Sequence, residues 1–199
     1  RVAFLPPDTA QEVTNTGAAL GFNEVNTLFP KIELRYDMKM DAFALNFIGG
    51  YQSYEIENLT TKNTENIDSY VLGARAKVNF GPAYAGLSLT YRQNGNNYGA
   101  WTGVSKESAV FQGNDLKDGE AFGYVAALGW KVNDMFTIEG SFSSLSSEQD
   151  TSLNNEDDAM AYGVIGKITV APGVYIIPEL IFQDNKDNVT NGVTTEQGD

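Results

Sequence analysis

The chain has 199 residues and a formal net charge of −13, with 20% charged and 12% aromatic residues. It contains no cysteine and no histidine, which excludes disulfides, thiolate metal sites, thiol nucleophiles and the usual catalytic triads. The negative charge argues against nucleic acid as a partner. No apolar run approaches the roughly 18 residues of a transmembrane helix, whereas a membrane β-barrel stays possible because its alternating strands are polar on average.

The clearest pattern in the chain lies at residues 31–40. Every odd position is charged and every even position is apolar or aromatic. A repeat of two residues places one set on each face of a β-strand, whereas a helix would mix the two sets around its surface. The length also matches the roughly 9–11 residues of a tilted strand that crosses a bilayer. The pattern therefore predicts a strand with one polar and one apolar face.

The same alternation recurs along the chain and predicts eight strands. They cover residues 28–40, 43–56, 69–80, 83–93, 120–132, 136–145, 159–171 and 174–183. Residues 1–26 and 184–199 are predicted to be loops or terminal segments, in which residues 2–5 are interpreted as the remnant of an earlier strand. Pro178 cannot donate to a strand ladder, so we expect it at a bulge or at an unpaired side.

The connections between these strands alternate in length. Those at Asp41, 81–82, 133–134 and 172–173 are a few residues long, and the other three are long, acidic and rich in asparagine. Outer-membrane barrels segregate their connections in this way, with short periplasmic turns and long external loops.

Alternation alone leaves open whether the apolar face points into a soluble core or outward at lipid. Aromatic residues gather near both ends of this face, as they do at the two interfaces of a membrane. Small residues are frequent on the polar face, although glycine weakens an ordinary exposed strand. They are Gly73, Gly86, Gly123, Ala127, Gly129 and Gly163. Both features favour lipid.

On these features residues 28–183 resemble bacterial outer-membrane β-barrels of the porin type. The resemblance implies an all-β, antiparallel, up-and-down transmembrane β-barrel that is a channel for ions and small hydrophilic solutes in the bacterial outer membrane. It also implies contact with outer-membrane lipid and lipopolysaccharide, a homotrimer, and no cofactor. If the short turns are periplasmic, both chain ends lie outside. We therefore expect an internal fragment of a larger barrel.

The charged residues of the polar faces would line the lumen of such a barrel. They are Lys31, Glu33, Arg35, Asp37, Lys39, Arg75, Lys77, Arg92, Lys131, Glu139, Lys167 and Glu179. Basic residues outnumber acidic ones in this set, and charged side chains set the selectivity of a pore. One hypothesis is a mild anion preference. The alternative is that these charges pair with one another across neighbouring strands and only keep a solvent-facing wall polar.

Two of the long connections carry further candidates. The loop at 94–119 contains Tyr98, Trp101 and Phe111, which predicts that it packs on something. It either folds into the lumen as a constriction or lies over the rim or against a neighbouring subunit. The acidic run Glu156, Asp157 and Asp158 offers oxygen ligands that suit calcium, but without the spacing of an EF-hand loop it is only a weak metal candidate.

Three other functions compete with a passive channel. We predict no enzyme activity, because barrel hydrolases usually activate their nucleophile or water with histidine. A plugged structural or adhesive outer-membrane barrel would fit the same strands but would not conduct. A soluble, lipocalin-like ligand-binding barrel has the same repeat turned inside out, and it would need no detergent.

Overall fold

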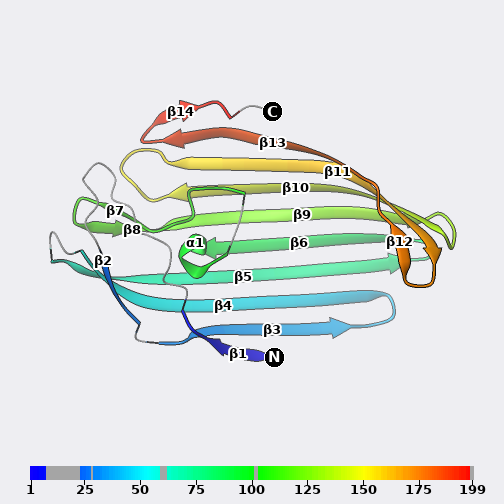
Figure 1. The fold of residues 1–199 in the computed structure, drawn as a ribbon, viewed down its shortest axis with the longest axis horizontal. Helices are drawn as coiled ribbons and strands as arrows, with labels where there is room; N and C mark the ends of the chain where they lie inside the picture. Colours follow the sequence, from blue (N-terminus) through cyan, green and yellow to red (C-terminus); the bar gives the residue numbers. More distant parts are fainter. Residues whose placement is uncertain (8–22, 28, 59–61, 101–102, 198–199) are drawn as a thin grey trace.

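The computed structural model describes residues 1–199 except for 8–22, 28, 59–61, 101–102 and 198–199 (Figure 1). It is all-β, with 72% strand and 2% helix. Among the described residues, no helix combines the length and the apolar character that crossing a membrane requires.

One antiparallel sheet dominates the structure. Ten strands follow one another across it in the order β1 (Val2–Leu5), β3 (Lys31–Lys39), β4 (Phe43–Asn58), β5 (Thr64–Phe80), β6 (Ala83–Gln93), β9 (Gly119–Lys131), β10 (Phe136–Gln149), β11 (Glu156–Ala171), β13 (Glu179–Thr190) and β14 (Val193–Thr195). Two short strands complete the sheet, because β2 (Asn23–Asn26) pairs with β4 and β12 (Val174–Ile176) pairs with β11. The connection between β6 and β9 contains α1 (Gly95–Tyr98) and the hairpin of β7 (Val110–Gln112) and β8 (Asp115–Lys117).

Seven of the eight predicted strands each correspond to one strand of the sheet, and the eighth corresponds to β12 and the start of β13. β1 pairs with β3 where an earlier strand was expected. The observed strands are longer at the ends that carry the long connections. β5 begins at Thr64, and β10 ends at Gln149. The extra residues continue the ladders with β4 and β11, because backbone pairing needs no particular side-chain pattern.

The terminal segments differ from the prediction. Residues 184–190 are not a loop but continue β13, which turns back into β14, and residues 23–26 form β2. These polar segments pair because the long neighbouring strands offer free backbone groups, as where Val189 lies opposite Glu156. The rest of the predicted N-terminal loop, at 8–22, lies outside the described residues.

Pro178 interrupts the last predicted strand, as expected. The chain leaves the ladder at residues 177–178 and separates β12 from β13. The carbonyl oxygen of Pro178 still accepts a hydrogen bond from the N–H of Gly166 at 2.9 Å. Proline can accept but cannot donate, so the break occurs where only its carbonyl is used.

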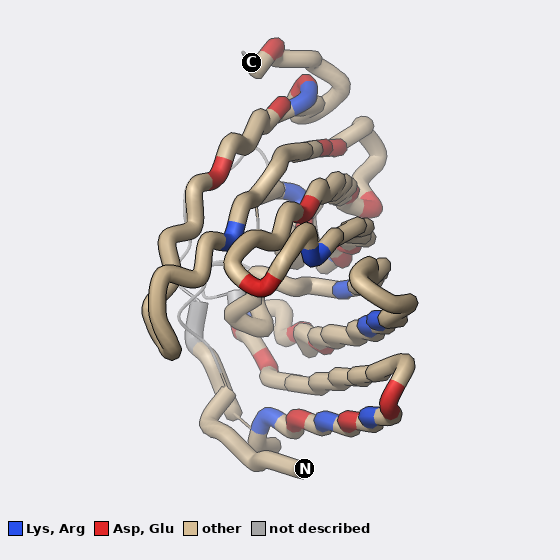
Figure 2. Tube along the Cα trace, turned by 90° about the vertical axis from the view of Figure 1, so that its right-hand side faces the viewer, with Lys and Arg blue, Asp and Glu red and all other residues tan. Residues whose placement is uncertain are grey.

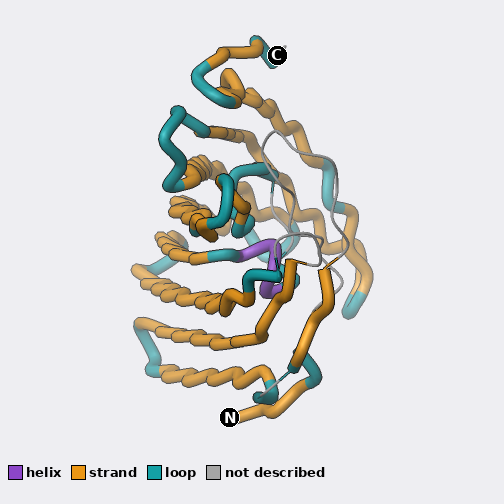
Figure 3. The backbone as a smooth tube through the Cα atoms, turned by 90° about the vertical axis from the view of Figure 1, so that its left-hand side faces the viewer, coloured by secondary structure: helices purple, strands orange, loops and turns teal. Residues whose placement is uncertain are grey.

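The sheet is curved and open. Its strands, seen nearly end-on in Figure 3, form an arc with α1 on the concave side. β1 and β14 lie at opposite ends of the strand order, and the described residues do not close into a barrel. The prediction of an all-β antiparallel sheet is therefore confirmed, while the transmembrane barrel stays a prediction.

The two faces of the sheet have different characters. The polar face carries the predicted lumen charges, and those of β3 alternate with uncharged residues along the strand, near the N-terminus in Figure 2. The apolar face opposite carries exposed leucines: Leu34 is 53% exposed, Leu72 53%, Leu128 67% and Leu180 62%. α1 packs on the polar face, because Tyr98 lies over Gly50. The polar face is therefore the concave one.

Two of the short turns use glycine in a conformation that other residues rarely adopt. Gly81 has φ +65° and Gly173 has φ +80°. Such left-handed residues match the twist of the strands that a tight hairpin joins. At a third turn the side chain of Asn133 accepts hydrogen bonds from the N–H groups of Met135 and Phe136, at 2.9 and 2.8 Å.

Candidate functional site

Residues 94–119, apart from 101–102, form a segment that packs on the polar face, and we call it the inner loop. A buried ion pair anchors it beside β6: Arg92 Nε donates to Glu107 Oε2 at 2.7 Å, and Glu107 is 0% exposed. Asn97 adds a second anchor, because its Oδ1 accepts from the Ala109 N–H at 2.8 Å and its carbonyl accepts from Gln52 at 2.7 Å. A loop held by buried, charge-assisted hydrogen bonds has a defined position.

A small apolar core lies between the inner loop and the extended ends of β4 and β5. Its buried members are Tyr54, Ile56, Ile67, Ala109 and Phe111, with Leu116 packed against them. Tyr54, Ile56 and Ile67 belong to the polar face by their position in the strands, but here that face is covered. Burying these side chains stabilises the loop on the sheet by roughly 1.5–3 kcal/mol each.

The same loop also reaches the far side of the sheet. The N–H and the hydroxyl of Ser105 donate to Asp157 Oδ2 on β11 at 2.6 and 2.7 Å. Lys106 Nζ donates to Thr190 on β13 at 2.7 Å. Partial burial lowers the pKa of Lys106, and the nearby charge of Asp157 opposes this shift. The inner loop therefore spans the concave side from the β3–β6 half of the sheet to the β10–β13 half.

Tyr98 fastens the loop to β3. Its hydroxyl donates to Glu33 Oε1 at 3.1 Å, and Lys31 Nζ lies 3.7 Å from the centre of its ring while donating to its carbonyl at 2.9 Å. Burial raises the pKa of Tyr98, and the neighbouring carboxylate of Glu33 raises it further. Gly50 lies beneath the ring, where a Cβ would overlap the tyrosine hydroxyl.

The described part of the loop at 94–119 packs on the polar face of the sheet, and its role as a constriction stays a prediction. Tyr98 and Phe111 are buried there, while Trp101 lies outside the described residues. The loop also changes the surroundings of three predicted lumen residues. Lys31 and Glu33 contact it, and Arg92 is only 8% exposed beneath it and does not face open space. The sequence pattern placed Arg92 on the correct face but did not reveal this cover.

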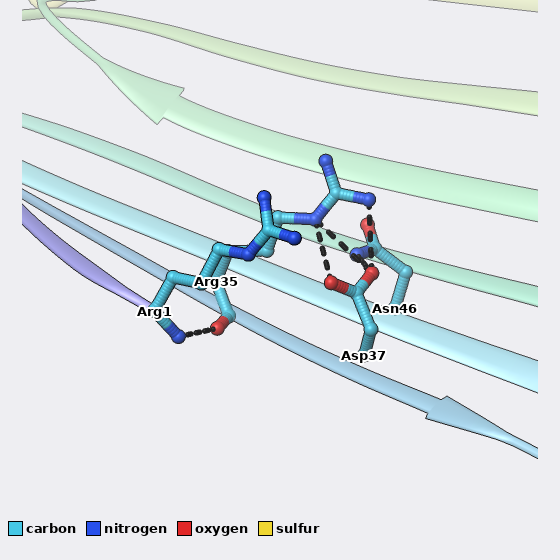
Figure 4. A network of polar contacts seen from close by, with 4 residues as sticks. All are labelled: Arg1, Arg35, Asp37 and Asn46. Atoms are coloured by element: carbon cyan, nitrogen blue, oxygen red, sulfur yellow. Dashed lines mark hydrogen bonds and ion pairs between the residues drawn. The ribbon is translucent and has the colours of Figure 1, made fainter.

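The remaining part of the polar face is uncovered. On β3, Arg35 Nε lies 2.8 Å from Asp37 Oδ2, and Asn46 of β4 donates to the same carboxylate (Figure 4). These charges pair along one strand, and the pair is about half exposed. Exposed pairs of this kind contribute little to stability. Both charges are therefore accessible to solvent and solutes on the concave side of the sheet.

A second cluster crosses four strands of the uncovered part. Lys77 Nζ of β5 lies 3.7 Å above the ring of Tyr84 on β6, and the Tyr84 hydroxyl donates to Glu139 on β10. The tyrosine reaches Glu139 by lying over Gly129 of β9, where a Cβ would overlap its ring. Tyr84 was not among the predicted site residues. A signal for it in the sequence was Gly129, one of the small residues on the polar face.

The other predicted lumen residues lie on exposed surface. Lys131 pairs with Asp134 at 2.7 Å in a short turn, and this hydrogen bond lowers the pKa of Asp134. Lys167 Nζ lies 4.0 Å from the ring centre of Tyr175. Lys39 and Glu179 are exposed. Some apolar side chains share this face, among them Ile48 and Ile181.

The weak calcium candidate is not supported. Asp157 is buried and accepts two hydrogen bonds from Ser105, whereas Glu156 and Asp158 are exposed. Neighbouring residues of a strand point to opposite faces, so the three carboxylates do not converge. Across the described ranges, no group of three or more potential ligands is placed to hold a metal ion.

No protein-family model matches the chain, and no curated protein or solved structure shows significant similarity to it. The two faces of the sheet and the inner loop are therefore the features that bear on function.

Proposed function

We propose that this chain forms the wall of a porin-like channel of the bacterial outer membrane, through which ions and small hydrophilic solutes diffuse passively. One observation carries the proposal. The sheet exposes large apolar side chains over its convex face, such as Leu128 at 67% and Leu180 at 62%, while most of the predicted lumen charges and the inner loop lie on the concave face.

The exposed apolar face is the strongest support for a membrane. Contiguous apolar patches of more than a few hundred Å² are rare on soluble monomers. Transfer of a fully exposed leucine side chain from water to an apolar medium is favourable by roughly 1.5–3 kcal/mol. A bilayer would remove many such side chains from water together. The paired backbone groups of a sheet already have their hydrogen bonds and need no water inside the bilayer.

Aromatic pairs on the same face add support. Tyr51 and Tyr70 have ring centres 5.2 Å apart, and those of Tyr162 and Phe182 are 5.4 Å apart. A further pair, Tyr124 and Phe142, has its ring centres 5.9 Å apart. These pairs lie near the middle of the observed strands, on the long-connection side of Leu72, Leu128 and Leu180. We place the aromatic girdle of the external membrane interface at this level. Loops beyond that girdle would contact lipopolysaccharide.

The uncovered polar face favours a mild anion preference. Arg75, Lys77 and Lys167 have no ion pair within the part of the chain that the structure describes. Closure of the wall would take further strands at the two edges of the sheet, and we include a homotrimer in the proposal. No catalytic step and no cofactor form part of it.

The experiment is conductance in planar lipid bilayers with the protein purified in detergent. We expect stable single-channel steps that scale with salt concentration, and a reversal potential in a salt gradient that indicates anion preference. A protein that stays dispersed without detergent, or one that inserts without any conductance, would overturn the channel. Cation preference would overturn only the anion preference.

A plugged structural or adhesive barrel is the second candidate, because the inner loop crosses the concave side from β3 to β13. Replacement of residues 95–117 by a short glycine–serine linker separates the two functions. A channel conducts before the replacement and conducts more after it, whereas a plugged barrel conducts only after it.

A further inference from the structure

We propose that Arg75 and Lys77 form an oxyanion-binding site in a cleft of the uncovered polar face, and that it takes the phosphate or carboxylate group of a small hydroxylated solute. The cleft has a volume of about 350 Å³ and spans β5, β6, β9 and β10. This lies within the range of about 300–1,000 Å³ that is usual for small-molecule sites. The inference deepens the proposed channel, because it names the solute class that the wall would bind.

The lining of this cleft combines small residues, hydroxyl groups and charges. In the register, Gly86 lies opposite Lys77 and Ser88 lies opposite Arg75, and Ala127 and Ser141 continue the row of Lys77. Tyr84 and Glu139 complete the lining, with the Tyr84 ring against the Lys77 ammonium. A solute can therefore approach the backbone closely and meet both cations and hydroxyl donors.

The two cations are available to a ligand. Neither Arg75 nor Lys77 has an ion pair with any residue in the described ranges. The closest acidic residue along the row of Arg75, Asp37, already accepts from Arg35 and from Asn46, which lies between it and Arg75. Arg75 therefore adds an uncompensated charge to this wall.

Lys77 is held in place by Tyr84, which acts as a positioning residue. The ring of Tyr84 lies 3.7 Å from the ammonium group, and its hydroxyl donates to Glu139. Glu139 is the only acidic side chain among the described residues that line the cleft, and this hydrogen bond holds it beside Tyr84. The hydrogen bond therefore engages the one carboxylate of the cleft with Tyr84 instead of with Arg75 or Lys77.

The spacing of the cations suits an oxyanion. Residues i and i+2 of a strand are about 6.7 Å apart on one face, so the side chains of Arg75 and Lys77 can converge on one group. A guanidinium binds two oxygen atoms of a phosphate or carboxylate in parallel, and an ammonium adds a point charge. Chloride can use the charges but not the bidentate geometry.

The test is calorimetric titration of the intact protein in nonionic detergent with inorganic phosphate, acetate and chloride. We expect saturable binding of phosphate or acetate, with chloride at least tenfold weaker. The arm that binds more tightly assigns the site to phosphate or to carboxylate. Absence of saturable binding in both arms, or chloride binding of equal strength, would overturn the inference.

Variants locate the site. Arg75→Gln and Lys77→Gln should each weaken oxyanion binding about tenfold, because each loses one charge-assisted contact. The matched control is Lys62→Gln, which removes the same charge from a long connection, where Lys62 pairs with Glu57 at 3.0 Å. Equal affinities in all three variants and the unaltered protein would place the binding elsewhere and refute the site.

The positioning role has its own readout. Tyr84→Phe keeps a ring beneath Lys77 but frees the Glu139 carboxylate, so oxyanion affinity should fall about threefold. Adding Glu139→Gln to that variant should restore the affinity, which a merely structural role of Tyr84 would not do. Failure of the double variant to recover would show that Tyr84 does not act by engaging the Glu139 carboxylate.

These results are independent of conduction. A protein that conducts but binds no oxyanion would refute this site and leave the channel standing. A protein that binds oxyanions at Arg75 and Lys77 but never conducts would refute the channel and leave the site standing.

Discussion

The covered and uncovered parts of the polar face show how one sequence pattern leads to two environments. Beneath the inner loop, Arg92 and Glu107 form a buried ion pair at 2.7 Å. On the uncovered part, Arg35 and Asp37 form a pair of similar length, at 2.8 Å, with both side chains about half exposed. Arg92 and Arg35 both lie in strands on the polar face, but the partner of Arg92 belongs to the inner loop and only that pair is buried, so only that pair should matter for stability.

The largest expected effect is at Glu107. Glu107→Ala leaves the buried guanidinium of Arg92 without its partner and should destabilise the docked loop by about 3–5 kcal/mol. We expect rapid cleavage within residues 94–119 in limited proteolysis, while the rest of the sheet stays resistant. The matched control is Asp37→Ala on the uncovered part, which should leave the cleavage rate unchanged. Equal cleavage of the two variants would remove the distinction between covered and uncovered pairs.

Two adjacent glycines give the next largest effect. Gly50→Ala places a Cβ against the hydroxyl of Tyr98, and overpacking of this kind costs about 1–3 kcal/mol. Gly49→Ala is the control, because its Cβ would meet only Leu72, at 3.8 Å, on the opposite face. Chemical denaturation in detergent should separate the two variants. A Gly50→Ala protein as stable as the control would show that Tyr98 does not lie over Gly50.

A smaller effect is expected from pH at Tyr98. Burial raises the pKa of Tyr98 in the docked loop above its usual value of about 10. The docked state then binds the tyrosine proton more tightly than the free loop does. Its stabilisation is complete below about pH 10 and declines as the pH rises further.

Limited proteolysis of the inner loop at about pH 8 and pH 11 measures this dependence. Cleavage should increase at the higher pH in the unaltered protein. Tyr98→Phe should lose the part of the increase that comes from this hydroxyl. An identical increase in both proteins would assign the effect to other groups.

The smallest effect on stability is expected on the uncovered part. Exchange of Arg35 and Asp37 for each other keeps the pair and its exposure, so the denaturation midpoint should not move. The same exchange moves a positive charge along the wall, so the reversal potential should shift slightly if this face lines a pore. A clear loss of stability would show that this pair is more than a solvated contact.

The positions of the strands were predictable because a repeat of two residues is a local property. The alternation along β3 and the interruption at Pro178 both appear in the structure where the sequence indicated them. The extensions of β5 and β10 were not predictable from alternation, because most of their side chains are polar on both faces. Ile67 lies on the polar face, where the inner loop buries it.

The candidate site was predictable only in part. The charged residues were assigned to the polar face from their spacing, but nothing in that spacing separates Arg92, which is buried, from Arg75, which is exposed. Tyr84 was missed because its partners belong to β5 and β10, far apart in sequence. Glycines on the polar face mark such contacts in the sequence, because Gly129 gives room to Tyr84 and Gly50 gives room to Tyr98.

The sequence by itself determined the strands, their two faces and the alternation of short and long connections, because each depends on neighbours a few residues apart. Only the tertiary structure decided which charges are covered, because the inner loop returns across strands that are distant in the chain. Burial depends on which segment covers a side chain, and an alternating pattern carries no information about which distant segment packs on a face of the sheet.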